Sequence, residues 1–364
     1  MITLIKNARL FSPMEEGIKD ILIVNGKIEK VDDRIELSGI EYDMIDACGR
    51  IVTPGFIDKH VHITGGGGEF GFGSFATEVT AEELLGVGTT TVLGLLGTDG
   101  VVKEVTTLYA KTKNLDTRLT AYMLSGSYSF PPKTITGSID GDIIFIDKVI
   151  GCKLALSDDR GSFPTEQELK RLLSQIWRGG MTSGKAGILH IHMGVLPSGI
   201  DLILKIARET PRLMPHISLT HCARQESLFK QCMEYAKMGG NLDITTGGSK
   251  FTEPYNALSI ALEAGVPLER ITFSSDGRGG IRHIDPVTGE ETYGTGSVDS
   301  NYEEFKNVIS NKVLTMTDAL RLLTVNPARE LALKSKGSIA KGYDADMIFF
   351  EDDLSINKVI SKGR

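Results

Sequence analysis

Eight short apolar runs that alternate with amphipathic stretches constrain the fold of this 364-residue chain more than any other feature. Runs of this length are typical of buried strands, and most of the intervening stretches have the spacing of amphipathic helices. One of these helices is preceded by Thr80-Ala81-Glu82-Glu83, which is a capping box. Strands that alternate with helices indicate βα units and a parallel sheet. Eight such units predict a TIM barrel, with its active site at the C-terminal ends of the strands. The runs are 55–63, 89–96, 118–125, 149–156, 187–193, 217–222, 241–246 and 271–275.

The two ends of the chain have a different pattern from its centre. Residues 1–53 read as short strands and turns, with Asn25-Gly26 as a hairpin signal, and the tail at 342–350 returns to strand character. We therefore predict an α/β fold with two domains. The (β/α)8 barrel takes residues 54–330, and residues 1–53 join residues 331–364 in a small β-sandwich.

Composition limits which molecules the chain can bind and indicates the cellular compartment in which it works. A net charge of −7 argues against nucleic acid as the main partner, because phosphate binding needs a basic surface. No apolar run is long enough to span a bilayer, and the first residues lack the features of a secretory signal. The four cysteines form no CxxC pair, which favours free thiols in a reducing compartment. We expect a cytoplasmic protein that does not bind membranes.

Residues with metal-binding side chains end several of the apolar runs. His60 and His62 are two apart on a strand, so their imidazoles point to the same side and can bind one metal ion. Later runs end in similar residues, and the whole set is His60, His62, Lys153, His192, His221 and Asp276. Because the C-terminal ends of barrel strands surround one site, this set predicts a metal centre.

Lys153 is the unusual member of this set. Alternation along the run 149–156 turns it toward the barrel interior, where a free ammonium would be costly. Reaction with CO₂ would convert its amine to a carbamate anion, which can bridge two metal ions. The alternative is that Lys153 pairs with a carboxylate or extends its amine to solvent. The nearby histidines favour the carbamate.

The remaining histidines receive other interpretations. His190 shares a face with His192 but lies deeper, so we expect a hydrogen-bonded core residue. His216 begins its strand and is expected to be structural, while His283 lies in a long glycine-rich segment and is expected to face solvent. Asp276 precedes a glycine and by itself would indicate a turn. In this set it is expected to touch a metal and share a proton with bound water.

Two metal ions held by imidazoles and carboxylates generate hydroxide at neutral pH and polarise a carbonyl group. The residues therefore indicate a hydrolase that acts on an amide-like bond.

The same residues resemble the binuclear amidohydrolase superfamily, which has HxH on strand 1, a carboxylated lysine on strand 4, histidines on strands 5 and 6 and an aspartate on strand 8. Within it, the chain most resembles the isoaspartyl (β-aspartyl) dipeptidases, over almost its whole length. HxH is shared by the whole superfamily, whereas GGGGE, GLLGTD and TITGS are far more specific to the dipeptidases. The matching stretches are PGFIDKHVHITGGGGE, TTTVLGLLGTDG, MLSGSYSFPPKTITGS, IDKVIGCKLALSDDRGS, HIHMG, LTHCAR and SSDG.

The resemblance implies a dipeptide substrate, two divalent metal ions with zinc as the expected element, and attack by a metal-bridging hydroxide. It implies that Glu69 holds the α-amino group and that Thr98 positions the same aspartyl end. Tyr128 would donate its hydroxyl to the developing oxyanion, while Arg160 and Arg224 would bind substrate carboxylates. Asp276 would carry the proton from the hydroxide to the leaving amine. The resemblance also implies a homo-oligomer, with an octamer as the expected assembly.

Three departures from the family pattern concern substrate preference and the tail. Gly280 stands where the family often has a serine that contacts substrate, so that contact is lost unless backbone or another loop residue replaces it. Asp159 stands where a histidine is expected. The chain ends at Arg364, earlier than is typical, which leads us to expect a missing or shortened last strand of the sandwich.

Two other functions stay open at this point. One is another amidohydrolase, either an N-acyl amino acid deacylase or a cyclic amidase similar to dihydroorotase or hydantoinase. Glu69 discriminates, because those substrates have no free α-amine for it to hold. The other is a catalytically silent scaffold, which the complete set of six predicted ligands disfavours.

Overall fold

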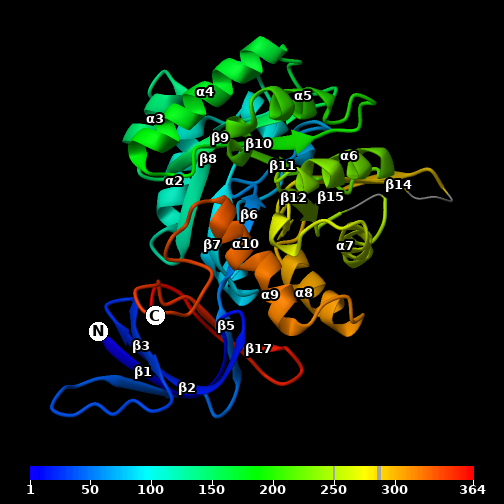
Figure 1. Ribbon diagram of the computed structural model, residues 1–364. Helices are drawn as coiled ribbons and strands as arrows, with labels where there is room; N and C mark the ends of the chain where they lie inside the picture. The colour runs from blue at the N-terminus through cyan, green and yellow to red at the C-terminus, as the bar shows by residue number, and fades with distance from the viewer. Residues whose placement is uncertain (249–250, 285–287) are drawn as a thin grey trace.

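The computed structural model describes residues 1–248, 251–284 and 288–364. Figure 1 shows a curled array of strands surrounded by helices, and below it a separate sheet beside which both chain ends lie. No described helix is long and apolar enough to cross a membrane.

Each of the eight predicted apolar runs contains a strand. Every residue of these eight strands is buried except one in β8, as expected when both faces of a parallel sheet are covered. The strands are β6 (Phe56–Val61), β7 (Thr89–Gly94), β8 (Thr120–Gly126), β9 (Val149–Leu156), β10 (Ile188–Met193), β11 (Ile217–Thr220), β12 (Leu242–Thr245) and β13 (Ile271–Ser274).

The eight strands follow one another in chain order around the curled array. Strands β6 to β11 form one parallel sheet, and β12 pairs with β13 in a second one. Single hydrogen bonds join the sheets at both edges: Cys222 N–H donates to Asp243 O (3.2 Å), and His62 N–H donates to Gly277 O (2.9 Å). The arrangement is consistent with the predicted TIM barrel and brings the C-terminal ends of all eight strands to one rim.

Helices lie around this array, as Figure 1 shows. The predicted capping box opens the first of them: Thr80 Oγ1 accepts from Glu83 N–H (3.1 Å), and Thr80 N–H donates to Glu83 Oε2 (2.8 Å). The helices are α1 (Ala81–Gly86), α2 (Val105–Leu115), α3 (Ile139–Phe145), α4 (Glu166–Ser183), α5 (Asp201–Glu209), α6 (Glu226–Lys237), α7 (Pro254–Glu263), α8 (Ser300–Ser310), α9 (Met316–Leu323) and α10 (Val325–Glu330). Short 3₁₀ helices are η1 (Phe72–Ser74), η2 (Thr98–Val101), η3 (Pro211–His216) and η4 (Leu268–Arg270).

Strands from both ends of the chain pair in one seven-stranded sheet of order β17-β16-β5-β1-β2-β3, with β4 beside β1. The sheet has its own buried cluster of apolar side chains, separate from the core that the barrel shares with its helices. Because these strands form a single sheet, the predicted β-sandwich is not confirmed, and the domain limits stay a prediction. The strands are β1 (Ile2–Phe11), β2 (Glu15–Val24), β3 (Lys27–Asp32), β4 (Asp43–Asp46), β5 (Ile51–Pro54), β16 (Met347–Phe350) and β17 (Ile356–Ile360).

The glycine-rich segment after Asp276 is more ordered than the loop expected from its sequence. It forms an antiparallel hairpin of β14 (Gly280–Ile284) and β15 (Glu291–Thr295). Thr292, Tyr293 and Thr295 provide the strand propensity that the glycines obscure. The side chain of His283, which was expected to face solvent, lies outside the described part of the structure.

Candidate active site

The barrel places the six predicted metal ligands at or near the C-terminal ends of its strands. His60, Lys153 and His192 lie within β6, β9 and β10, while His221 directly follows β11. His62 follows β6, and Asp276 comes two residues after β13. His221 (φ 61°) and Asp276 (φ 55°) adopt left-handed backbone conformations, which are uncommon outside glycine and occur often at functional sites.

Three of these residues form a group that can hold a metal ion. One ligand atom each from His60, His221 and Asp276 lies within 4.8 Å of the others. His62 adjoins the group, with its Nε2 atom 3.2 Å from Asp276 Oδ1. His221 Nε2 and Asp276 Oδ1 are buried atoms without a hydrogen-bond partner in the part of the chain that the structure describes, which is costly unless a ligand satisfies them. Imidazole nitrogen with carboxylate oxygen is a donor set that suits zinc and similar divalent ions.

Lys153 reaches the edge of this group. Its side chain is fully buried (0% exposed), and its Nζ atom lies 3.4 Å from His60 Nε2. In the described part of the chain Lys153 forms no ion pair with a carboxylate. Burial lowers the pKa of its amine to about 7, so a substantial fraction is uncharged near neutral pH.

His192 lies beside the group, but both of its ring nitrogens have other contacts. The ring centroids of His192 and His221 are 4.5 Å apart. His192 Nδ1 lies 2.6 Å from Tyr128 Oη, and Nε2 lies 3.1 Å from Asp158 Oδ2 and 3.0 Å from Arg224 Nη1. The structure therefore brings His192, Tyr128 and Arg224 together, and binding of a metal by His192 requires one of these contacts to be released.

The titratable side chains around the group have shifted pKa values. Burial lowers the pKa of His60 to about 3 and holds the pKa values of His192 and His221 well below the usual value, so all three are neutral, as metal ligands must be. Burial alone would raise the pKa of Asp276, but the adjacent imidazoles, His221 foremost, hold it well below its usual range. Burial raises the pKa of Tyr128, which therefore keeps its proton.

The glycine-rich loop after β6 places Glu69 near the mouth of the barrel. Glu69 Oε1 accepts from Thr98 Oγ1 (2.6 Å) and lies 3.3 Å from Arg160 Nη1. Glu69 Oε2 is buried and has no hydrogen-bond partner among the described residues. A Cβ atom on Gly280 would lie 2.6 Å from this oxygen, so the absence of a side chain at 280 gives the Glu69 carboxylate its room.

Asp158 is a site residue that the sequence reasoning missed. Its carboxylate accepts from Arg160 Nε (2.8 Å) and Nη2 (2.6 Å), and it also contacts His192. The Arg160 guanidinium lies over the Tyr128 ring, 5.3 Å from its centroid. Asp158 thus fixes the orientation of the Arg160 guanidinium through a forked pairing. The signal in the sequence that could have suggested this pairing is the pair of acidic residues directly before Arg160. Asp159, the unexpected residue of this segment, is exposed.

Two histidines outside the set behave as predicted. His190 is fully buried and hydrogen-bonded, with contacts to His60 and Ser218. His216 ends η3 just before β11, and its Nδ1 atom lies 2.6 Å from Gly187 O, which is a structural contact.

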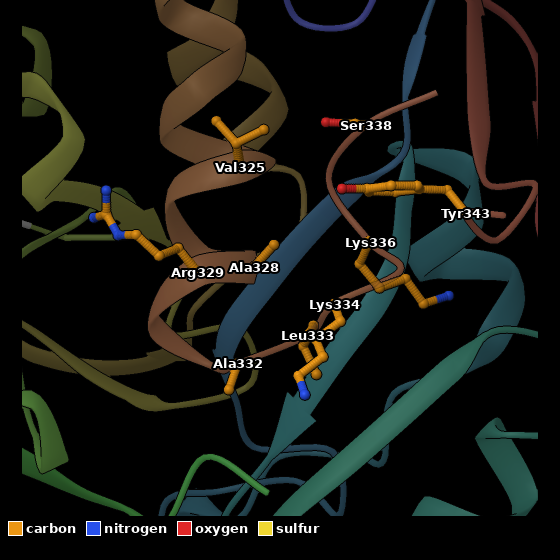
Figure 2. Close-up of a pocket in the computed structure, with 9 residues that line it drawn as sticks. All are labelled: Val325, Ala328, Arg329, Ala332, Leu333, Lys334, Lys336, Ser338 and Tyr343. Atoms are coloured by element: carbon orange, nitrogen blue, oxygen red, sulfur yellow. The ribbon is translucent and has the colours of Figure 1, made fainter. Parts of the chain in front are cut away.

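A cavity of about 240 Å³ lies between α10 and the segment that follows it (Figure 2). None of its lining residues belongs to the predicted site. The cationic side chains of Arg329, Lys334 and Lys336 point in different directions in Figure 2, so they do not converge on one ligand.

Comparisons with known proteins show the family to which the chain belongs. The model of the amidohydrolase family matches residues 186–364. The crystal structure of the β-aspartyl dipeptidase from Fervidobacterium islandicum AW-1, in complex with a β-Asp-Leu dipeptide, is 42% identical, with a TM-score of 0.93, and the match covers 100% of this chain and 95% of that one. The chain belongs to the β-aspartyl dipeptidase family of amidohydrolases. The family predicted from the motifs is thereby confirmed.

Other relatives match in part or in full. A second β-aspartyl dipeptidase structure from Fervidobacterium islandicum AW-1 is 40% identical, with a TM-score of 0.92, and covers 100% of this chain and 96% of that chain. The dihydroorotase from Aquifex aeolicus is 48% identical over 62 residues, which is 16% of this chain and 14% of that protein. The match to the dihydroorotase therefore spans only a small part of either protein, whereas the likeness to the dipeptidases covers both chains almost completely.

Proposed function

We propose that this protein hydrolyses the β-aspartyl peptide bond of dipeptides at a divalent metal centre. The observation that carries the proposal is Glu69 Oε2, a buried carboxylate oxygen without a hydrogen-bond partner in residues 1–248, 251–284 and 288–364, which lies in the loop after β6 and its histidines. Such an atom needs a cationic donor, and the α-ammonium of a β-aspartyl residue is one. The relative that is 42% identical was crystallised with β-Asp-Leu, which supports the same substrate class.

The metal centre would use all six predicted ligands. His60, His62, His221 and Asp276 already lie together, and the uncharged fraction of the Lys153 amine can react with CO₂ to form the bridging carbamate. We propose two ions, with zinc as the element, because imidazole and carboxylate donors suit it. When bound, the ions supply Lewis acidity and a hydroxide nucleophile at neutral pH.

The substrate would be held by charges of both signs around the centre. Glu69 binds the α-ammonium, and Thr98 keeps the Glu69 carboxylate in position through their 2.6 Å hydrogen bond. Arg160 and Arg224 bind the two carboxylates of the dipeptide. Before substrate enters, Arg160 is paired with Asp158 and Glu69, so these arginines are already oriented toward the site. Gly280 contributes space for Glu69 instead of a side-chain contact to substrate.

Proton transfer would rest on two side chains. Asp276 has a low pKa and is therefore ionised, so its carboxylate can accept the proton of the attacking hydroxide and then pass it to the nitrogen of the leaving residue. Tyr128 keeps its proton because burial raises its pKa, so its hydroxyl can donate to the carbonyl oxygen as negative charge develops there.

We further propose that the protein works in the cytoplasm as a homo-oligomer. The octamer is the assembly that the resemblance to the dipeptidases implies. The four free cysteines, of which Cys48 is exposed, support a reducing compartment. Its role would be to remove the isoaspartyl dipeptides that remain when damaged proteins are degraded.

A panel of four substrates tests the proposed activity. We expect metal-loaded protein to hydrolyse β-Asp-Leu and to leave α-Asp-Leu, β-Ala-Leu and dihydroorotate intact, because each of these lacks the β-linkage, the α-carboxylate or the free amine. Hydrolysis of dihydroorotate, with β-Asp-Leu left intact, would favour the cyclic amidase that the short dihydroorotase match suggests.

The Glu69→Gln variant tests the role of the carboxylate. Loss of the charged partner of the α-ammonium should lower kcat/KM for β-Asp-Leu by about 10²-fold or more while metal content stays constant. N-acetyl-β-Asp-Leu, which has no ammonium, is the control substrate and should be hydrolysed poorly by wild type. Equal hydrolysis of the acetylated and free dipeptides would favour a deacylase instead.

A further inference from the structure

His190 contacts the metal-ligand histidine His60 through a ring-to-ring hydrogen bond deep in the barrel. The distance between His190 Nε2 and His60 Nδ1 is 2.9 Å, and both side chains are fully buried. His190 lies on β10, two residues before His192, and belongs to neither the metal-capable group nor the substrate contacts described above. The question is which of the two nitrogens carries the proton.

The direction of this hydrogen bond decides whether His60 can bind a metal. His60 Nε2 faces the candidate centre, 3.3 Å from Asp276 Oδ1 and 3.4 Å from Lys153 Nζ. A neutral imidazole has one N–H, so Nε2 has a free lone pair only when the proton is on Nδ1. His60 Nδ1–H must then donate, and His190 Nε2 must accept. In the opposite direction the proton on Nε2 blocks the metal site.

Residues on the far side of His190 can support the direction that opens the site. If His190 Nε2 accepts, its own proton is on Nδ1, which lies 2.8 Å from Ser218 Oγ and can donate to it. Lys59 Nζ, which has only donors, lies 3.5 Å from the same oxygen. Lys59 is itself held by Glu330 Oε2 at 2.7 Å. A hydroxyl oxygen has two lone pairs, so Ser218 Oγ can accept from Lys59 Nζ and from His190 Nδ1–H at the same time.

We propose that His190 is a positioning residue that accepts the Nδ1 proton of His60 and so keeps the Nε2 lone pair of His60 available to the metal. The inference rests on the metal centre of the proposed function. Ligand histidines commonly donate their second N–H to a carboxylate or a carbonyl, and here a second imidazole takes that place. His190 thus acts on the metal through His60 and does not touch it.

Two variants of His190 separate hydrogen bonding from packing. His190→Leu fills a similar space but accepts no proton, and it should weaken binding of Zn²⁺ alone by about 10- to 100-fold in a chelator competition. His190→Gln can accept from His60 with its carbonyl oxygen and donate to Ser218 with its amide, so it should stay within about threefold of wild type. His216→Leu is the matched control, because His216 lies just before β11 and its Nδ1 atom contacts the backbone oxygen of Gly187, and it should bind Zn²⁺ as wild type does.

Wild-type affinity in His190→Leu would overturn the proposal, and so would equal weakening in the Leu and Gln variants, which would indicate packing alone. A measurement on unaltered protein guards against variants that do not fold. In zinc-loaded protein labelled with ¹⁵N-histidine, long-range ¹H–¹⁵N spectra should place the protons of both His60 and His190 on Nδ1, with His190→Gln used for assignment. A proton on His190 Nε2 would overturn the proposal.

Failure of this inference and failure of the proposed function can be distinguished. The zinc titration and the tautomer measurement use no substrate, so a protein without dipeptidase activity can still bear out the role of His190. Conversely, a protein that hydrolyses β-Asp-Leu but whose His190→Leu variant binds zinc normally would retain the function and lose the inference.

Discussion

Two fully buried lysines show how the two clusters inside the barrel differ. Lys59 Nζ lies 2.7 Å from Glu330 Oε2 and 3.4 Å from Asp243 Oδ1. We call these three residues with Ser218 the Lys59 cluster. Lys153 Nζ instead lies 3.4 Å from a neutral imidazole, that of His60. We call Lys153 with His60, His221 and Asp276 the Lys153 cluster.

Burial tends to lower the pKa of both amines, but the charged neighbours decide whether the pKa ends above or below its usual value. Burial alone would lower the pKa of Lys59, yet Asp243 and Glu330 outweigh it and raise the pKa above its usual value. Burial lowers the pKa of Lys153 to about 7 because its carboxylate neighbours are too distant to compensate. The comparison teaches that a paired buried lysine serves the fold, whereas one without an ion pair is available for chemistry.

The largest effect is expected from Lys153→Ala. Removal of the proposed bridging anion should lower turnover of β-Asp-Leu by about 10³-fold or more and reduce the metal content measured by elemental analysis. Added short carboxylic acids should restore part of both. Activity within about tenfold of wild type, with two ions bound, would show that Lys153 is as structural as Lys59.

The next largest effect is the pH dependence of the metal-free protein. His60, His190, His192 and His221 have folded-state pKa values below the 6.5 of the unfolded chain, so the unfolded state binds more protons below pH 6.5. The free energy of unfolding should therefore fall as pH falls through 6.5, by up to about 1.4 kcal/mol per pH unit for each histidine.

Urea denaturation of metal-free protein between pH 5 and pH 8 measures this dependence. Lys59 contributes nothing to it, because a raised lysine pKa gives stability that is lost only above about pH 10.4. A stability that stays flat from pH 7 to pH 5 would show that the histidines are not buried in neutral form.

Lys59→Met should change stability more than catalysis. It leaves Glu330 and Asp243 buried without their cation, which should cost about 3–5 kcal/mol in urea denaturation. Turnover of the folded variant should stay within about tenfold of wild type, since in the described structure the Lys59 side chain touches no member of the Lys153 cluster directly and is linked to His60 through Ser218 and His190. Lys30→Met, which breaks an exposed pair with Asp32, is the control and should cost at most about 1 kcal/mol. A stable but inactive Lys59→Met would contradict the division between the two clusters.

Gly280→Ala should have the smallest effect. Its Cβ would lie 2.6 Å from Glu69 Oε2, so the carboxylate must move and KM for β-Asp-Leu should rise by about tenfold with metal content unchanged. Gly73→Ala in the same region is the control, because its Cβ would meet no atom within 4 Å. An unchanged KM in Gly280→Ala would show that Glu69 tolerates displacement.

Much of the barrel could be predicted because strand formation depends on local pattern. All eight apolar runs contain strands, and Thr80 caps α1 as its capping box indicated. Alternation correctly placed His60 and His62 on one side, since both approach Asp276 Oδ1. The hairpin of β14 and β15 was mistaken for a loop, because glycines mask the strand pattern there.

The Lys59 cluster could not be predicted in the same way. The pairing of β6 with β7 is irregular between Asp58 and Val61, and alternation does not hold across such an irregularity. The side chain of Lys59 therefore contacts Ser218 and Asp243 inside the barrel, on strands distant from its own. Simple alternation would not place it there, because the side chain of the next residue, His60, also lies inside the barrel. Asp158 escaped attention for a related reason, since its contact with His192 joins the segment after β9 to β10.

The sequence by itself determined which residues end each strand, and therefore the likeness to the β-aspartyl dipeptidases and the chemistry of the donor set. Strand ends and side-chain types are local properties, so they can be predicted from the sequence alone. Only the tertiary structure decided that, among the described residues, Glu69 Oε2 has no hydrogen-bond partner, that Lys59 forms an ion pair and Lys153 forms none, and that His190 touches His60. Those properties depend on distances between loops and strands far apart in the chain, and curling of the sheet brings them together.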